Sequence, residues 1–153
     1  MKSFLISGAL MASAAAVPMA EARPLSITVD AASFSGPKAY VAVYLTDPQG
    51  KLYDTLWVAG PDTRYHSHLS NWSRMKHNSK VRISAVTGAS LRSGGSLKFS
   101  ADIANSKIAA GYKIMVDASI EDRGDWRRAA VLTLGKQTST DGGAIIRRLT
   151  VHQ

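Results

Sequence analysis

The feature that most constrains the fold is an alternation of apolar and polar residues with a period of two. Residues 96–102 place Leu97, Phe99 and Ala101 on one side and polar residues on the other. Residues 111–121 repeat the pattern, with Tyr112, Ile114, Val116, Ala118 and Ile120 opposite Lys113, Asp117, Ser119 and Glu121. Strands with this alternation bury one face and expose the other to water. The pattern therefore predicts half-buried antiparallel β-strands.

Eight segments fit such strands, and together they predict an all-β fold. Besides the two above, they are residues 25–31, 39–46, 51–58, 80–86, 129–134 and 144–151. The turn Asp47-Pro48-Gln49-Gly50 predicts a hairpin, because proline presets the second turn position and Gly50 can adopt a positive φ. Residues 60–77 break the alternation, and we expect a crossover with two helical turns there. Short strands with one long connection indicate a two-sheet antiparallel β-sandwich.

The first 22 residues have the order of a secretory signal peptide. Lys2 supplies a positive charge, residues 4–17 are apolar and rich in alanine, and Ala20-Glu21-Ala22 provides the small residues that signal peptidase requires. Cleavage after Ala22 would leave residues 23–153 as a single β-sandwich domain. The apolar run is shorter than the roughly 20 residues of a membrane-spanning helix. We therefore expect a periplasmic protein that does not span the membrane after signal removal.

The absence of cysteine and the excess of basic residues limit the chemistry of the chain. Without cysteine there are no disulfides, no thiol catalysis and no iron–sulfur ligation. The net charge is +8, and its densest cluster is Arg123, Arg127, Arg128, Arg147 and Arg148. In an exported protein this charge suits anionic lipids, wall polymers or acidic partners, or it simply keeps the surface solvated. Nucleic acid is not an expected partner, because the aromatic residues are not interleaved with the basic ones.

No catalytic constellation is present in the sequence. It has no Gly-x-Ser-x-Gly elbow, no His-Glu-x-x-His, no phosphate-binding Gly-Lys-Ser/Thr loop and no dinucleotide fingerprint. The adjacent Glu121 and Asp122 would point to opposite faces of a strand, so they do not form an acid–base pair. We assign no catalytic residue and do not expect an enzyme, apart from a role as a redox carrier.

The segment Ser84-Ala85-Val86-Thr87-Gly88-Ala89-Ser90 resembles the acceptor site for covalent FMN in extracytoplasmic proteins. That acceptor reads Asp-x-x-Ser/Thr-Gly-Ala-Ser/Thr, and its last hydroxyl is bonded to the flavin phosphate. Ser84 stands where the acceptor has aspartate. The resemblance implies attachment at Ser90, with the small neighbours Thr87, Gly88 and Ala89 giving access to the FMN transferase.

The residues after Ser90 also suit a phosphate group. The guanidinium of Arg92 could form a charge-assisted hydrogen bond with the flavin phosphate, and Ser93-Gly94-Gly95 would keep the loop mobile. The competing interpretation is a plain turn at the end of a strand, in which Gly88 takes a positive φ.

The histidines allow a metal-binding interpretation. On a strand, His66 and His68 would lie on the same side, where His77 or His152 could join them, and Asp62 is the nearest carboxylate. Such ligands suit Cu(II) or Zn(II). The spacing matches no established metal motif, so surface histidines in a polar connection are the competing interpretation.

Landmarks in a defined order cover nearly all of residues 23–153. They are Val41-Ala42-Val43-Tyr44, Asp47-x-x-Gly50-Lys51, Thr55-Leu56, Tyr65, Leu69, Trp72, Val86-Thr87-Gly88-Ala89-Ser90, Gly111-Tyr112, Glu121 and Gly124. They resemble a bacterial family of predicted periplasmic proteins with a domain of unknown function (family 2271). The chain departs from it at Tyr44, where the family often has tryptophan, and at Ser100-Ala101-Asp102, where the family has Trp-Asp-Gly.

The family resemblance carries expectations about fold and context. It implies an immunoglobulin-like antiparallel β-sandwich, loosely similar to that of flagellar hook-capping proteins. It also implies association with the FMN transferase and with membrane proteins of redox metabolism or reductive iron uptake.

Three functions stay open at the level of sequence. The first is an accessory or binding protein without a cofactor, which holds an unknown periplasmic or membrane partner by its loops or a sheet edge. The second is a carrier of covalent FMN on Ser90 in extracytoplasmic electron transfer. The third is a metal-binding protein that uses His66 and His68. The departure at Ser84 favours the first.

Overall fold

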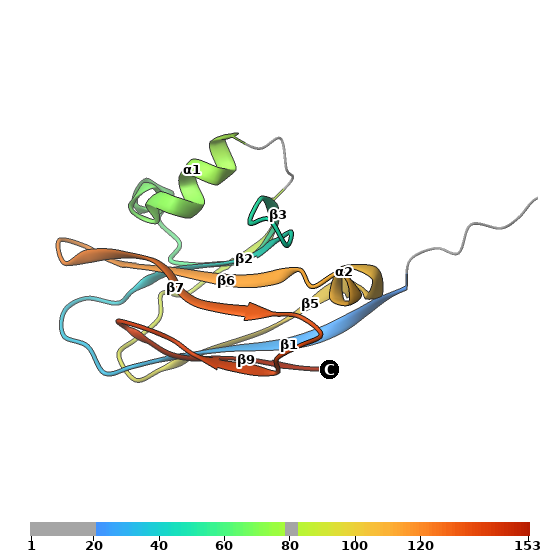
Figure 1. Cartoon of the computed structure of the whole chain (residues 1–153). Coiled ribbons are helices and arrows are strands. Elements are labelled where there is room, and N and C mark those ends of the chain that lie inside the picture. Colours follow the sequence, from blue (N-terminus) through green and yellow to red (C-terminus); the bar gives the residue numbers. More distant parts are fainter. Residues whose placement is uncertain (1–20, 79–82) are drawn as a thin grey trace, which may run out of the picture.

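A computed structural model describes residues 21–78 and 83–153 and shows two β-sheets packed face to face (Figure 1). The four-stranded sheet has the order β5 (Ser96–Ala104), β1 (Ala22–Ala31), β9 (Ile146–His152) and β8 (Ser139–Asp141). The five-stranded sheet has the order β4 (Ile83–Gly88), β3 (Leu52–Ala59), β2 (Tyr40–Thr46), β6 (Lys113–Ile120) and β7 (Gly124–Thr133). All neighbouring strands are antiparallel except β3 and β4. The all-β sandwich is confirmed, and its likeness to immunoglobulin domains stays a prediction.

The strand predictions are confirmed in the described residues, with shifted ends. The largest shift is in β7, which begins at Gly124, and the strand expected over residues 80–86 lies partly outside the described residues. The predicted crossover contains the 3-10 helix η1 (Thr63–His68) and the helix α1 (Ser70–Asn78). Strand β8 and the short helix α2 (Asn105–Ala109) are additional elements. Both are too short for a period to show in the sequence.

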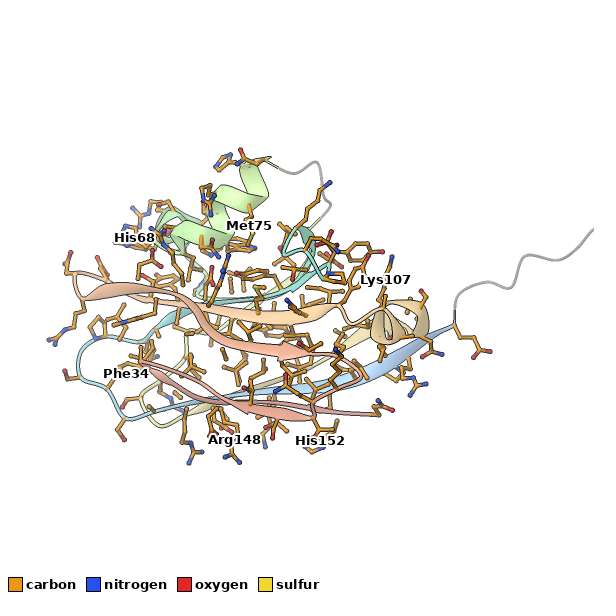
Figure 2. The ribbon with its side chains drawn as sticks, viewed as in Figure 1. Phe34, His68, Met75, Lys107, Arg148 and His152 are labelled. Carbon is orange, nitrogen blue, oxygen red and sulfur yellow. The ribbon has the colours of Figure 1, made fainter. Side chains whose placement is uncertain are left out.

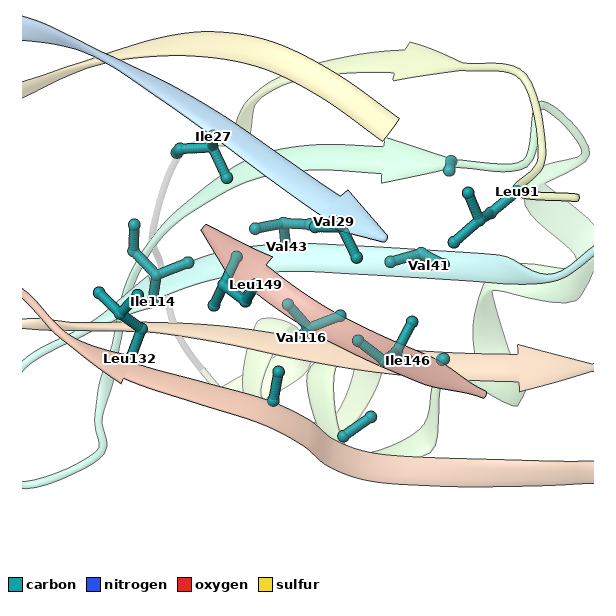
Figure 3. Close-up of a cluster of buried hydrophobic side chains, with 14 of the residues drawn as sticks. Ile27, Val29, Val41, Val43, Leu91, Ile114, Val116, Leu132, Ile146 and Leu149 are labelled. Carbon is teal, nitrogen blue, oxygen red and sulfur yellow. The ribbon is translucent and has the colours of Figure 1, made fainter. Parts of the chain in front are cut away.

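The main hydrophobic core fills the space between the two sheets (Figure 2, Figure 3). Its central side chains are at most 1% exposed and are Ile27, Val29, Val41, Val43, Ile114, Val116, Leu132, Ile146 and Leu149. Burying each of these aliphatic side chains stabilises the fold by about 1.5–3 kcal/mol. Along β1 the buried residues alternate with less buried ones from Leu25 to Ala31. The period-two pattern therefore determines which face of this strand turns inward.

A second hydrophobic cluster lies on the opposite face of the five-stranded sheet, which α1 covers (Figure 1). Its buried members are Ala42, Tyr44, Leu52, Val58, Leu69, Trp72 and Met115. Strand β6 is consequently buried on both faces, and Asp117 is 0% and Ser119 2% exposed. The prediction of a solvent-exposed face for residues 111–121 is wrong, because a helix from a distant part of the chain packs on that face.

Asp117 is the centre of a buried hydrogen-bond network that holds α1 on the sheet. Its Oδ1 accepts hydrogen bonds from the Tyr44 hydroxyl at 3.0 Å and from the Arg128 backbone N–H at 2.8 Å. Its Oδ2 accepts from the Trp72 backbone N–H at 2.9 Å and from Asn71 Nδ2 at 3.3 Å. These four donors compensate a charge whose burial would otherwise be very costly.

The environment of Asp117 predicts a pH dependence of stability. Burial raises the pKa of Asp117 above its ordinary value of 3.8, and hydrogen bonds from the Arg128 N–H and Tyr44 only partly oppose this. An acid with a raised folded-state pKa stabilises the fold fully below its unfolded-state pKa, and this contribution is lost as the pH rises through the folded-state pKa. We expect the free energy of unfolding from urea denaturation to fall as the pH rises from about 4. The pH-dependent part of the free energy of unfolding that Asp117 contributes should be absent in Asp117→Asn. The same pH profile in the wild type and in Asp117→Asn would contradict this prediction.

Candidate functional site

The chain passes from the five-stranded to the four-stranded sheet through the segment that contains Ser90. At its start, the Gly60 N–H donates to the carbonyl oxygen of Gly88 at 2.9 Å. At its end, Ala39 and Leu91 exchange two backbone hydrogen bonds of 2.8 and 2.9 Å. Ser90 lies between these two anchors, just after β4. The predicted position of Ser90 at the end of a strand is therefore confirmed.

Gly88 is required by the packing of Trp57. A Cβ atom at Gly88 would lie 2.4 Å from Cζ2 of Trp57, which is far closer than van der Waals contact allows. Gly88 is not among the glycines with a positive φ, so the interpretation as a turn with a positive φ is wrong. The Trp57 ring stacks on Phe99 of β5 with centroids 5.0 Å apart. This stacked pair joins the two sheets near the Ser90 segment.

Gly88→Ala should lower the free energy of unfolding by about 1–3 kcal/mol, because the added methyl group must displace the Trp57 ring. The loss should be smaller in a Trp57→Leu background, which leaves room for the methyl group. Urea denaturation of the wild type, of Gly88→Ala, of Trp57→Leu and of the double variant measures the coupling between the two positions. Gly143→Ala is the control, since its Cβ would meet its nearest atom only at 3.9 Å. Equal losses in both backgrounds would show that the ring is not the cause.

Ser90 lines an open cleft of about 330 Å³ beside the start of β5. The cleft is lined by Ala89, Ser90, Leu91, Arg92, Gly95, Ser96, Leu97 and Lys98, none of which is acidic. Ser90 is half-buried, and Arg92 and Lys98 are exposed. Neither cation takes part in an ion pair between described residues. The cleft therefore presents a hydroxyl and two positive charges to an anion.

The loop after Arg92 is held by hydrogen bonds, which corrects the expectation that residues 93–95 are mobile. The Gly94 N–H donates to the carbonyl oxygen of Ala32 at 3.0 Å. The Phe34 N–H donates to Oγ of Ser93 at 2.8 Å. Because both bonds reach the chain that follows β1, the cleft wall is fixed to the four-stranded sheet.

The residues of the flavin-acceptor segment are only partly described. Ser84 and Thr87 belong to the backbone of β4, and their side chains lie outside the described part of the chain. Ala89 is exposed next to Ser90, which leaves room for an enzyme to approach. A phosphoester on Ser90 would lie in a cleft with two cations, and the residues present therefore fit an FMN phosphate.

The predicted strand geometry of His66 and His68 is wrong, because both residues lie in η1. A 3-10 helix has three residues per turn, so positions two apart point in different directions. His66 Nε2 donates to the carbonyl oxygen of Gly60 at 2.8 Å, whereas His77 is in α1 and His152 in β9. Within the described residues, no three His, Asp or Glu side chains are placed to hold a metal ion.

Comparison with protein families matches residues 22–145 to the family described as predicted periplasmic protein (DUF2271). The chain belongs to this family. The DUF2271 match confirms the resemblance seen in the sequence and the periplasmic localisation that the family description states. Comparisons with curated proteins and with solved structures found no match. Among the described residues of this DUF2271 protein, no helix is long and apolar enough to cross a membrane.

Proposed function

We propose that this DUF2271 protein is a periplasmic carrier of covalently bound FMN, with Ser90 as the attachment residue. The observation that carries the proposal is the cleft at Ser90, where Arg92 and Lys98 flank a half-buried hydroxyl and no lining residue is acidic. Transfer of the FMN phosphoryl group to Ser90 Oγ from a flavin dinucleotide would break the bond between its two phosphates, release a nucleoside monophosphate and the hydroxyl proton, and create a phosphodiester with one negative charge. Charge-assisted hydrogen bonds from the two cations would stabilise it.

Several residues around Ser90 would each contribute to binding the FMN phosphate. Arg92 offers a planar set of donors for two phosphate oxygens, and Lys98 adds a second charge from β5. Hydrogen bonds that fix residues 93–95 hold the backbone next to Arg92, so little additional ordering is needed on binding. When bound, FMN supplies transfer of one or two electrons.

Export and partners form part of the same proposal. The predicted signal peptide over residues 1–22 lies almost entirely outside the described residues, and the family match begins at Ala22. Cleavage after Ala22 would release residues 23–153 as one domain into the periplasm, where an FMN transferase would modify Ser90. The family context of membrane redox proteins or reductive iron uptake would then provide the route for electrons.

A cofactor-free binding module is the second candidate function. The observation that favours it is the outer face of the four-stranded sheet, where Lys98 and Ser100 of β5 and Arg148 of β9 are exposed. The absorption spectrum of the protein purified from its native periplasm distinguishes the two candidate functions, because oxidised flavin absorbs at about 450 nm. A colourless protein would favour the binding module.

Restoring the carboxylate of the acceptor motif should improve attachment. Ser84→Asp should raise the FMN-modified fraction several-fold when the protein is co-expressed with an FMN transferase, because it supplies the group that the resembling motif presents. Intact-mass spectrometry after a fixed expression time measures the fraction. Ser84→Ala is the matched control and should resemble the wild type. Equal FMN-modified fractions in all three proteins would show that the transferase does not recognise the residue at position 84.

A further inference from the structure

A second cleft, of about 320 Å³, lies between α1, the β2–β3 turn and β7. Its lining residues are Gly50, Lys51, Leu52, Arg74, Met75, Asn78 and Arg128. Leu52 belongs to the second hydrophobic cluster, and Met75 of α1 packs against that cluster (Figure 2). The cleft thus combines three cations with an apolar floor. It shares no lining residue with the cleft at Ser90.

The positive charge of this cleft is balanced only in part, by the buried carboxylate of Asp117, which accepts hydrogen bonds from the Arg128 backbone N–H and from Asn71. Lys51, Arg74 and Arg128 take part in none of the ion pairs between described residues. Residues 79–82, which follow α1 in the sequence, include no Asp or Glu. The carboxyl end of α1 contributes about half a negative charge, which is small against three positive charges. An anion would therefore relieve the repulsion between the three cations.

Arg128 has a backbone conformation that glycine adopts more easily. Its φ is 51°, and it lies where the pairing of β6 with β7 shifts register. Such a bulge is commonly made by glycine, which has no Cβ to cause strain. The positive φ strains the backbone of an arginine at this point, and backbone strain of this kind is concentrated at functional sites. The strain is consistent with use of the Arg128 side chain in the cleft.

The buried network holds the backbone of Arg128 and the guanidinium of Arg74. The Arg128 backbone N–H donates to Asp117 Oδ1 at 2.8 Å. Arg74 donates from a guanidinium nitrogen to Asn71 Oδ1 at 3.0 Å, and Asn71 Nδ2 donates to Asp117 Oδ2 at 3.3 Å. One buried carboxylate thereby orients the backbone of one arginine and, through Asn71, the guanidinium of the other. Because the Arg74 guanidinium is held in this way, it loses less freedom when a ligand binds.

We infer that this cleft binds a phosphate-bearing anion, with Arg74, Arg128 and Lys51 as its donors. Guanidinium groups bind phosphate oxygens through paired, charge-assisted hydrogen bonds, and a lysine adds a point charge. The phosphate belongs either to a soluble phosphorylated compound or to a lipid headgroup. Both sources present the same chemistry to the cleft, and the experiment below separates them.

Pyrophosphate is the probe for the site, titrated by calorimetry into the whole protein at low ionic strength. The wild type should bind it saturably, and Arg74→Gln and Arg128→Gly should each bind about tenfold more weakly or worse. Arg147→Gln, on the opposite sheet, is the control and should bind as the wild type does. Arg128→Gly should also keep or raise the thermal midpoint, because glycine relieves the strained φ. Unchanged binding in Arg74→Gln and Arg128→Gly would overturn the inference.

Vesicles of phosphatidylglycerol and phosphatidylcholine identify the source of the phosphate. Sedimentation of the wild type with these vesicles, lost in Arg128→Gly and Arg74→Gln but kept in Arg147→Gln, would assign the site to a lipid headgroup. Saturable pyrophosphate binding with no dependence of sedimentation on the two arginines would assign it to a soluble compound. Absence of pyrophosphate binding, together with equal sedimentation of all four proteins, would overturn the inference.

Discussion

Asp117→Ala should destabilise the protein by about 3–5 kcal/mol, which is a large part of the total stability of a domain of this size. The substitution removes the common acceptor of four hydrogen bonds. The Tyr44 hydroxyl and the Trp72 N–H would remain in a buried place without this partner, and each such group costs about 1–3 kcal/mol. Because Asn71 and Trp72 belong to α1, the helix should also lose protection from hydrogen exchange.

Thermal and urea unfolding measure the effect of Asp117→Ala. A loss of this size should lower the thermal midpoint by about 10 °C or more. Asp102→Ala is the matched control, because Asp102 is exposed on β5, and its effect should stay within about 0.5 kcal/mol. A loss below about 1 kcal/mol in Asp117→Ala would show that the four donors find other partners and that the network does not hold α1.

Ser90→Ala should abolish covalent FMN on the protein when it is co-expressed with an FMN transferase. The alanine has no oxygen to form the phosphoester, so the effect should be complete. Ser90→Thr should retain the adduct, since the resembling motif accepts either hydroxyl. Ser106→Ala is the control and should keep the adduct, because Ser106 is an exposed serine of α2 that does not line the cleft. Flavin fluorescence of the denatured protein in a gel detects the adduct, and a fluorescent Ser90→Ala band would place attachment elsewhere.

The strands could be predicted because each carries its own pattern. In β5, Leu97, Phe99 and Ala101 alternate with more exposed residues in the structure as they do in the sequence. The same reasoning fails for β6, where Asp117 reads as a solvent-exposed residue but is completely buried. The covering helix α1 is some 40 residues away in the sequence, and a period-two pattern carries no information about what packs on each face.

The site residues were harder to predict than the strands, because their roles depend on distant contacts. Gly88 reads as a turn residue, yet its role depends on Trp57 of the neighbouring strand. His66 and His68 would converge on a strand but not in η1. The cations of the second cleft, Lys51, Arg74 and Arg128, come from three separate elements. No local spacing connects them, and an arginine at a bulge is visible only once φ is known.

The mass of the peptide of residues 83–92 tests attachment at Ser90 most directly. Trypsin releases this peptide by cleaving after Arg82 and Arg92, from protein co-expressed with an FMN transferase that modifies a known acceptor in the same cells. Attachment predicts a mass increase equal to FMN less one water, with fragment ions that locate it on Ser90. A peptide found only in its unmodified form would contradict the assignment of this protein as an FMN carrier.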